Sequence, residues 1–362
     1  MKAINFIIDS LYIGGAEIVL VELANELSKD CVVNVFAIYD GPLSRNLCPQ
    51  VNYKFIVGGG NANRYDHVRR IFSVIKRGCF LKFPNLFLGK EVVKEEPIIA
   101  FLENLAVKAV GNYRGKNKKI AWIHTDIEKQ QKRFRHDGSV YNKFNNIVFS
   151  SYSAMDIFKK KYTLVNAPSM AVIYNGLDYS KIKLLAEEET RATLKEEYSL
   201  SVGRLCDAKD YLGLLDALRR AYDSGYTLKH YIIGDGPDRK SIENKITELG
   251  LSNKVFLLGG LHNPYPYIKK SKLFVHNAKW EGFGLVIVEA AILDTVAVVR
   301  RTGATEEICS FLNTGYLYDS EDELIDLLLK HSLFPSKHSK TLQYRELTYS
   351  AMKKKVLEVI YD

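Results

Sequence analysis

Two glutamates enclose a glycine-containing turn in the run W-E-G-F-G-L-V-I-V-E-A, with seven residues between Glu281 and Glu289. Gly282, Phe283 and Gly284 fall at the expected start of a helix, directly after the strand-like run L-F-V-H-N-A. The free N–H groups and the dipole of a helix N-terminus attract phosphate, and glycines let it approach closely. We therefore expect an anion at this turn, with the carboxylates accepting hydrogen bonds from a sugar hydroxyl and a ribose. The alternative is a solvated helix start without a ligand.

Two basic residues, Arg204 and Lys209, follow another strand-like run in S-V-G-R-L-C-D-A-K-D. The carboxyl end of a strand is the usual ligand edge of an open α/β sheet. An arginine and a lysine that converge there on a diphosphate would neutralise the charge of a leaving group, a task that metal ions perform elsewhere. The sequence has no D-x-D and no His/Asp/Glu cluster at ligand spacing, so we expect no metal. Two solvated cations are the alternative interpretation.

Three weaker signals lie near the ends of other strand-like runs. Gly14 and Gly15, in L-Y-I-G-G-A-E, suit either close backbone approach to a ligand or a plain strand-to-helix turn. His124, in K-I-A-W-I-H-T-D, suits either a donor to a sugar hydroxyl or phosphate, or a structural histidine. The run I-I-G-D-G-P-D-R has Arg239 where a dinucleotide-binding motif needs its third glycine, so we interpret it as a turn.

All of these residues lie in a sequence where segments with the hydrophobic period of a strand alternate with segments with the period of a helix. Strands are predicted over 3–9, 32–39, 98–102, 119–124, 146–151, 170–176, 198–204, 229–235, 254–260, 273–278 and 296–301. Helices are predicted over 16–28, 211–225, 239–250 and 284–293, and the buried face of the first is expected to contain Ile18, Leu20, Val21, Leu23, Ala24 and Leu27. This alternation predicts an α/β fold with two doubly wound parallel sheets, in Rossmann-like domains over 1–178 and 179–344. A helix over 345–362 follows.

Composition and charge limit the class of protein. A chain of 362 residues that is 47% hydrophobic exceeds the roughly 250–300 residues that one core supports. No run reaches the roughly 20 apolar residues of a membrane-spanning helix. The N-terminal run does not resemble a signal peptide and the five cysteines are scattered, so we expect a cytoplasmic protein with reduced thiols. Residues 1–180 contain 25 basic and 16 acidic residues, whereas residues 181–362 contain 26 of each. The whole net charge of +9 therefore lies in residues 1–180.

The motifs form an ordered set: G-G-A-E, the strand-end His124, Y-N-G-L-D, V-G-R-L with a lysine five residues after the arginine, I-I-G-D-G-P, N-P-Y-P-Y-I and E-G-F-G-L-V-I-V-E. This set closely resembles the family 4 retaining glycosyltransferases, over nearly the whole chain and most specifically from Tyr174 to Glu289. The resemblance implies the GT-B fold, in which two Rossmann-like domains face a central cleft. It also implies that the last helix returns to the first domain.

By this resemblance, the second domain binds a nucleotide diphosphate sugar as substrate, and transfer needs no metal or other cofactor. Arg204 and Lys209 would hold the diphosphate, Glu281 would orient the transferred sugar, and Glu289 would hold the ribose. The amides that would meet the sugar and phosphate belong to Gly282, Phe283, Gly284 and Leu285. The departing phosphate would help to deprotonate the acceptor on the same face, so that the anomeric configuration is retained without a carboxylate nucleophile.

The same resemblance places Gly15 and His124 across the cleft, near the donor phosphate and sugar. Two departures from the family pattern leave the donor sugar open. Asn277-Ala278-Lys279 replaces the serine-containing approach that is common before the E-G-F motif, and R-T-G-A-T-E-E-I is a loose version of a later element. UDP-linked hexoses or N-acetylhexosamines are favoured, ahead of GDP-mannose.

The first domain would recognise the acceptor, and this domain carries the excess positive charge. Residues 64–90 interleave Arg and Lys with apolar residues, a pattern that suits docking on an anionic membrane surface. We expect a lipid-linked glycan acceptor, used in the synthesis of capsule, lipopolysaccharide or another surface polysaccharide. The protein would then be peripheral on the inner face of the cell membrane. The alternative is that residues 64–90 form a solvated basic face that binds no membrane. Rival activities are a sugar-nucleotide epimerase or a phosphorylase of the same fold. We expect no nucleic-acid binding, because no known signature for it occurs.

Overall fold

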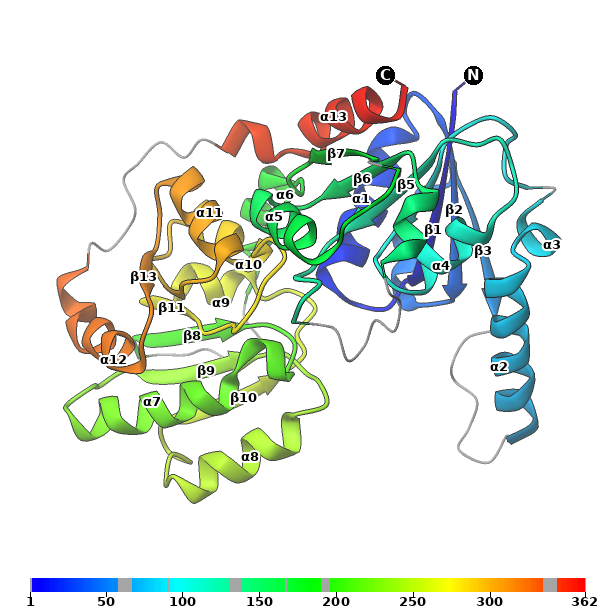
Figure 1. The fold of residues 1–362 in the computed structure, drawn as a ribbon. Helices are drawn as coiled ribbons and strands as arrows, with labels where there is room; N and C mark the ends of the chain where they lie inside the picture. Colours follow the sequence, from blue (N-terminus) through cyan, green and yellow to red (C-terminus); the bar gives the residue numbers. More distant parts are fainter. Residues whose placement is uncertain are drawn as a thin grey trace. The chain divides into compact units, whose positions relative to one another are not determined.

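The chain folds into two compact units, each built on a parallel sheet (Figure 1). One unit comprises Met1–Leu177 together with Arg345–Asp362, and the other comprises Asp178–Tyr344. The structure is a computed structural model that describes residues 2–57, 67–89, 91–129, 138–166, 168–189, 196–334 and 344–361, with the backbone alone for 67–71 and 344–345.

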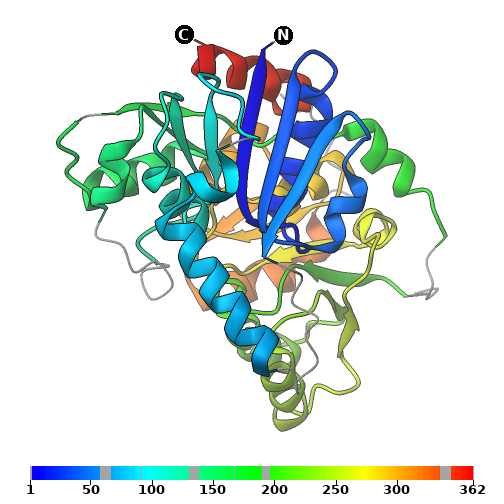
Figure 2. The ribbon, with the colours of Figure 1, turned by 90° about the vertical axis from the view of Figure 1, so that its right-hand side faces the viewer.

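Within the described residues, the first unit has a seven-stranded parallel sheet in the order β3-β2-β1-β4-β5-β6-β7 (Figure 2). Its strands are β1 (Ala3–Ser10), β2 (Val32–Tyr39), β3 (Val51–Val57), β4 (Ile98–Phe101), β5 (Lys119–Ile123), β6 (Asn146–Phe149) and β7 (Ser169–Val172). Strand β4 is apolar and buried along its whole length, as expected where helices cover both faces of a sheet.

The helices of the first unit are α1 (Gly15–Leu27), η1 (Pro42–Asn46), α2 (His67–Lys82), α3 (Asn85–Leu88), α4 (Leu105–Asn112), η2 (Ser139–Lys143), α5 (Tyr152–Lys161), η5 (Tyr344–Leu347) and α13 (Tyr349–Tyr361). The C-terminal helix α13 packs against α1. The Tyr361 hydroxyl donates to Ala3 O (3.2 Å), and Lys353 Nζ donates to Glu26 O (3.1 Å). These bonds fix the end of the chain to the first unit.

The second unit has a six-stranded parallel sheet within the described residues, in the order β10-β9-β8-β11-β12-β13. Its strands are β8 (Tyr198–Val202), β9 (Lys229–Ile233), β10 (Val255–Gly259), β11 (Leu273–His276), β12 (Ala297–Arg300) and β13 (Tyr316–Tyr318). Its helices are α6 (Tyr179–Leu185), η3 (Asp207–Lys209), α7 (Tyr211–Asp223), α8 (Arg239–Glu248), α9 (Tyr265–Lys270), α10 (Leu285–Ile292), α11 (Gly303–Leu312), α12 (Glu321–Leu329) and η4 (Lys330–Leu333).

Each sheet reverses its strand order at one point, between β1 and β4 in the first unit and between β8 and β11 in the second. The loops after the strands on either side of such a reversal diverge, and ligands of doubly wound folds bind in the resulting crevice at the carboxyl ends. The predicted fold class of two doubly wound parallel sheets is confirmed. The prediction omitted two edge strands, β3 and β13.

One detail of the predicted core is wrong. Ile18 is 42% exposed, and Val19 is buried in its place. Helix α1 packs against η1, β2 and α13, so its buried face is set by three neighbours, of which α13 is distant in sequence. Among the helices in the described ranges, none combines the length and apolar character needed to cross a membrane.

Candidate functional site

Asp210 organises the loop that follows β8, although the sequence analysis did not single it out. It is the N-cap of α7, with a φ of 49°, and its Oδ1 accepts from the Gly213 amide (3.3 Å). The same carboxylate forms ion pairs with Lys279 (Oδ1 to Nζ, 3.0 Å) and Arg300 (Oδ2 to Nη1, 2.8 Å). Because Asp210 directly follows η3, these contacts fix the backbone of Lys209.

The loop after β11 is bonded to the loop after β8, its neighbour across the reversal. Asn277 Nδ2 donates to Asp210 O (2.8 Å), and the Lys279 amide donates to Ala208 O (2.9 Å). The Tyr318 hydroxyl donates to Asn277 Oδ1. Asn277 and Lys279, which depart from the family pattern, therefore cross-link the two loops that carry the predicted site residues.

Lys209 and Glu281 form an ion pair between these loops, with Lys209 Nζ donating to Glu281 Oε1. Their side chains are only 18% and 16% exposed. His276, the last residue of β11, places its Nε2 3.2 Å from the same carboxylate oxygen. The structure thus brings together two predicted residues and a histidine that sequence reasoning missed.

Burial raises the pKa of the Glu281 carboxyl, but the Lys209 ammonium and the adjacent His276 ring outweigh burial, so that the pKa lies well below its usual range. Burial, and then the charge of Lys209, lower the pKa of His276. At neutral pH Glu281 is therefore a carboxylate and His276 a neutral imidazole.

Arg204 lies exposed on the loop directly after β8 and has no hydrogen bond or ion pair with another described residue. Its loop is fixed by the run I-I-G-D-G-P. The Leu205 amide donates to Asp235 O (3.0 Å), and a Cβ on Gly236 would lie 2.3 Å from Leu205 O. The glycine there permits close backbone packing. The run is therefore the turn that we predicted, and it leaves the guanidinium available to a ligand.

Gly284 lets α10 begin directly at the loop after β11. Its φ is 91°, a conformation that favours glycine. Helix α10 begins at Leu285, and the Ile287 amide bonds back to Gly284 O (2.9 Å). The amides of Leu285 and Val286 precede any intrahelical acceptor, so they are the donors that this helix start offers to an anion. The buried loop residues before the helix are Gly282, Phe283 and Gly284.

Glu289 lies one helical turn into α10 and bonds to a tyrosine of α9. The Tyr265 hydroxyl donates to Glu289 Oε1 (3.3 Å). Glu289 is half-buried, and burial raises the pKa of its carboxyl to about 7. The two predicted glutamates therefore differ in charge at neutral pH, because, of these two, only Glu281 has a cation beside it among the described residues.

In the first unit, Gly15 and His124 follow β1 and β5. Gly15 is the exposed first residue of α1. The His124 ring centroid lies 4.4 Å from that of Phe101 and 5.6 Å from that of Trp122. Both ring nitrogens are buried, and neither has a partner among the described residues. Burial lowers the pKa of His124 to about 3, so the ring is neutral near pH 7.

Two acidic residues, Glu103 and Asp9, also lie at the carboxyl ends of first-unit strands, and the sequence analysis did not predict them. Glu103 is buried after β4, and its Oε2 accepts from the His124 amide (3.0 Å). Burial raises the pKa of Glu103 to about 7. Asp9 caps α4 by accepting from the amides of Leu105 (3.2 Å) and Ala106 (2.8 Å). Both acids hold the loops beside the reversal between β1 and β4.

The site in the second unit can bind an anion through the Arg204 guanidinium, the Lys209 N–H groups that Glu281 does not use, and the backbone amides at the start of α10. The carboxylate of Glu281 beside them can accept from a hydroxyl. Within the described ranges, no group of three His, Cys, Asp or Glu side chains is arranged to hold a metal ion. The predicted cleft, and any meeting of residues from the two domains there, stays a prediction.

The part of the chain that carries this site matches a known protein family. Residues 184–343, which include every predicted site residue of the second unit, match the family described as glycosyl transferases group 1. An uncharacterized glycosyltransferase of Methanocaldococcus jannaschii is 29% identical over 39% of this chain and 37% of its own. A Campylobacter jejuni protein is 30% identical over 46% of this chain and 45% of its own; its name is N-acetylgalactosamine-N,N'-diacetylbacillosaminyl-diphospho-undecaprenol 4-alpha-N-acetylgalactosaminyltransferase. The chain thus spans less than half the length of these two relatives.

Longer matches extend over both units. A second Campylobacter jejuni protein, named GalNAc-alpha-(1->4)-GalNAc-alpha-(1->3)-diNAcBac-PP-undecaprenol alpha-1,4-N-acetyl-D-galactosaminyltransferase, is 24% identical over 90% of this chain and 86% of its own. The crystal structure of Anabaena HepE in complex with UDP and glucose has a TM-score of 0.76 over 99% of both chains, at 18% identity, and so shares the fold. Residues 184–343 therefore belong to the glycosyl transferases group 1 family, on a chain whose two units have the GT-B fold.

Proposed function

We propose that this protein is a retaining glycosyltransferase that moves a hexose or N-acetylhexosamine from a nucleotide diphosphate sugar, UDP-linked in first preference, to a glycan acceptor without a metal. The observation that carries this proposal is the convergence of Arg204, the Lys209–Glu281 pair and the start of α10 at one reversal of strand order. Cations and helix amides placed there suit a diphosphate leaving group. The family match over the same residues and the UDP complex of HepE support it.

Each charged group then has a task in the transfer. The Lys209 ammonium has three N–H donors, and Glu281 accepts from one, so the others can meet the diphosphate. Glu281 orients the sugar through a hydroxyl, and Glu289 accepts from the ribose. As the bond between the anomeric carbon and the phosphate oxygen breaks, a bond to the acceptor oxygen forms on the same face. The acceptor proton passes to the departing phosphate. His124 is neutral and donates one N–H to the sugar or phosphate.

We infer a lipid-linked acceptor in surface polysaccharide synthesis. Both Campylobacter jejuni relatives have names that describe transfer to undecaprenol-diphosphate-linked sugars. Further relatives are named for lipopolysaccharide core biosynthesis in Rhizobium meliloti and for capsular polysaccharide biosynthesis in Staphylococcus aureus. The protein would then act from the cytoplasm at the inner face of the cell membrane.

A transfer assay tests the activity directly. UDP-linked and GDP-linked sugars are incubated with lipid-diphosphate acceptors, with and without EDTA, and release of the nucleoside diphosphate is measured together with the glycan product. We expect release of the nucleoside diphosphate only when acceptor is present, and an axial glycosidic bond in the product of an α-linked donor. The activity with EDTA should be within about twofold of the activity without it, because protein cations replace the metal. Conversion of the donor into an isomeric nucleotide sugar, without net release of the nucleoside diphosphate, would favour the epimerase alternative. A phosphorylase would instead require inorganic phosphate.

The raised pKa of Glu289 predicts that donor binding depends on pH. Only the carboxylate accepts hydrogen bonds from both ribose hydroxyls, and its fraction rises from about one-tenth at pH 6 to about nine-tenths at pH 8 for a pKa near 7. The affinity for UDP-glucose should therefore rise up to about tenfold over this range. Titration calorimetry of Glu289→Gln should show weaker binding with no such rise, whereas Glu197→Gln, an exposed control, should keep the wild-type profile. A pH profile shared by all three proteins would contradict the assigned role.

We propose that α2 docks the protein on an anionic membrane. Of the predicted segment 64–90, residues 64–66 and 90 and the side chains of 67–71 lie outside the described residues. The described part exposes Phe72 (68%), Val74 (55%) and Ile75 (56%), beside the exposed Lys76. Apolar residues beside a basic residue suit shallow insertion among anionic headgroups.

Vesicle flotation tests this docking. The double variant Phe72→Ser and Ile75→Ser should lower binding to phosphatidylglycerol vesicles at least severalfold, because insertion of apolar side chains drives the association. Val165→Ser is the matched control, because Val165 is 86% exposed elsewhere on the first unit. An equal loss in both variants would refute docking through α2.

A further inference from the structure

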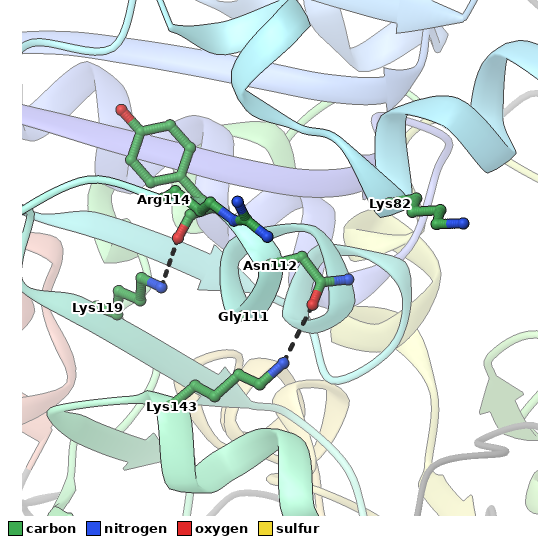
Figure 3. Close-up of a pocket in the computed structure, with 7 residues that line it drawn as sticks. Lys82, Gly111, Asn112, Arg114, Lys119 and Lys143 are labelled. Carbon is green, nitrogen blue, oxygen red and sulfur yellow. Dashed lines mark hydrogen bonds between the residues drawn. The ribbon is translucent and has the colours of Figure 1, made fainter.

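A pocket of about 390 Å³ lies in the first unit, at the amino end of β5 (Figure 3). It is open to the surface and is lined by residues from four elements and the loop after α4. The lining residues are Lys82, Gly111, Asn112, Tyr113, Arg114, Lys119 and Lys143. Lys82 ends α2, Asn112 ends α4, Lys119 begins β5 and Lys143 ends η2.

The lining contains four cations and no carboxylate. Lys82, Arg114, Lys119 and Lys143 form no ion pair with any acid in the described part of the chain. The carbonyl ends of α2 and α4 each contribute roughly half a negative charge, so they offset about one of the four positive charges. About three positive charges therefore remain without a counter-ion.

Hydrogen bonds hold these cations in place. Lys119 Nζ donates to Tyr113 O (2.7 Å) and Lys143 Nζ donates to Asn112 Oδ1 (3.1 Å), as Figure 3 shows. Each ammonium uses one donor in this way and keeps two for a ligand. Burial, and then the nearby charge of Lys143, lower the pKa of Lys119. An anion bound by the free donors of both ammonium groups would offset their charges.

Arg114 is held by a neighbouring segment with an apolar surface. The Arg114 amide donates to Asn85 Oδ1 and Asn85 Nδ2 donates to Arg114 O, each at 2.7 Å. Phe83 and Leu86, on either side of Asn85 in sequence, are 51% and 81% exposed. The segment that holds the Arg114 backbone therefore exposes apolar side chains.

The pocket is distinct from the site that carries the proposed function. Lys119 begins β5 and His124 directly follows its end, so the two positions are about 16 Å apart at roughly 3.3 Å per residue. The pocket lies at the amino end of the strand, whereas His124 lies at the carboxyl end, which is the ligand edge of the sheet.

We propose that this pocket binds a phosphate group, either of a soluble phosphate compound or of a phospholipid headgroup. Arginine and lysine donors match phosphate oxygens, and the absence of a carboxylate from the lining leaves the phosphate charge unopposed. The exposed Phe83 and Leu86, on the segment that holds the Arg114 backbone, suit contact with the acyl region beside a headgroup.

Calorimetric titration with pyrophosphate tests the proposal. The double variant Arg114→Gln and Lys143→Gln should weaken binding about tenfold or more, because each removes a hydrogen bond to a charged group. Both residues are exposed, so the fold should be kept. Lys159→Gln with Lys160→Gln removes the same charge from exposed positions at the end of α5 and should leave the affinity unchanged. Equal affinities in the two double variants would overturn the proposal.

Lys209→Met separates this pocket from the donor site. Pyrophosphate should still bind the Lys209→Met protein with an affinity that depends on Arg114 and Lys143. Loss of all binding in that variant alone would assign the anion to the donor site and overturn the pocket. If the pocket variant also loses flotation with phosphatidylglycerol vesicles, the source is a lipid headgroup. Unchanged flotation with weakened pyrophosphate binding identifies a soluble phosphate compound.

Discussion

Glu281→Gln and Lys209→Met are each expected to lower turnover by about 10²–10³-fold, and the double variant is expected to regain stability without regaining activity. The activity loss follows from the proposed role of Lys209, since removal of one preorganised charge donor costs this much in other enzymes. Glu281 acts on the same sugar diphosphate, so the double variant should be about as inactive as either single variant.

The stability of these variants follows the opposite pattern. Each single change leaves one charge of a mostly buried pair without its partner and should cost about 2–4 kcal/mol in free energy of unfolding. Removal of both charges leaves two neutral groups of similar size. The double variant should therefore unfold within about 1 kcal/mol of the wild type, because a replaced ion pair is often neutral for stability.

Denaturant unfolding and the transfer assay together measure this double-mutant cycle. The pair Lys229 and Glu196 is a suitable control, because it lies in the same unit with side chains 35% and 68% exposed. Lys229→Met with Glu196→Gln should change neither quantity appreciably, as is usual for surface pairs. A double variant of Lys209 and Glu281 with wild-type turnover would show that the pair is only structural.

His124→Phe is expected to stabilise the first unit while lowering turnover by about 10²-fold or more. The imidazole packs against the rings of Phe101 and Trp122, and its nitrogens are buried without partners in the described structure. Each buried unpaired polar atom costs about 1–3 kcal/mol, so a phenyl ring should raise the free energy of unfolding by about 1–3 kcal/mol. The same change removes the N–H that the proposed reaction uses.

Thermal unfolding and steady-state kinetics of His124→Phe separate the two effects. His124→Gln should recover part of the lost turnover, because its amide supplies an N–H donor in nearly the same volume. Turnover near the wild-type level in His124→Phe would show that the unpaired nitrogens do not meet the substrate. Lower stability in that variant would show instead that the ring makes a structural hydrogen bond.

The carboxyl ends of the predicted strands were the informative positions in the sequence. Arg204 and Lys209 follow β8, Glu281 follows β11 and His124 follows β5, and parallel strands place such residues at one edge of their sheet. Apolar runs in β4 and β5 made these central strands recognisable. Strand β13 has only three residues, and β3 exposes Asn52, Lys54 and Phe55, so neither edge strand has a strong apolar pattern.

The sequence by itself determined the fold class and predicted the residues that we propose to bind a sugar diphosphate, because both depend on local periodicity and on motifs a few residues long. Only the tertiary structure placed His276 and Asp210 beside these residues, gave Glu281 and Glu289 different charges, and gathered Lys82, Arg114, Lys119 and Lys143 around one pocket. Burial and the distance between charges decide these properties. Both depend on which segments, remote in sequence, the packed sheets bring together.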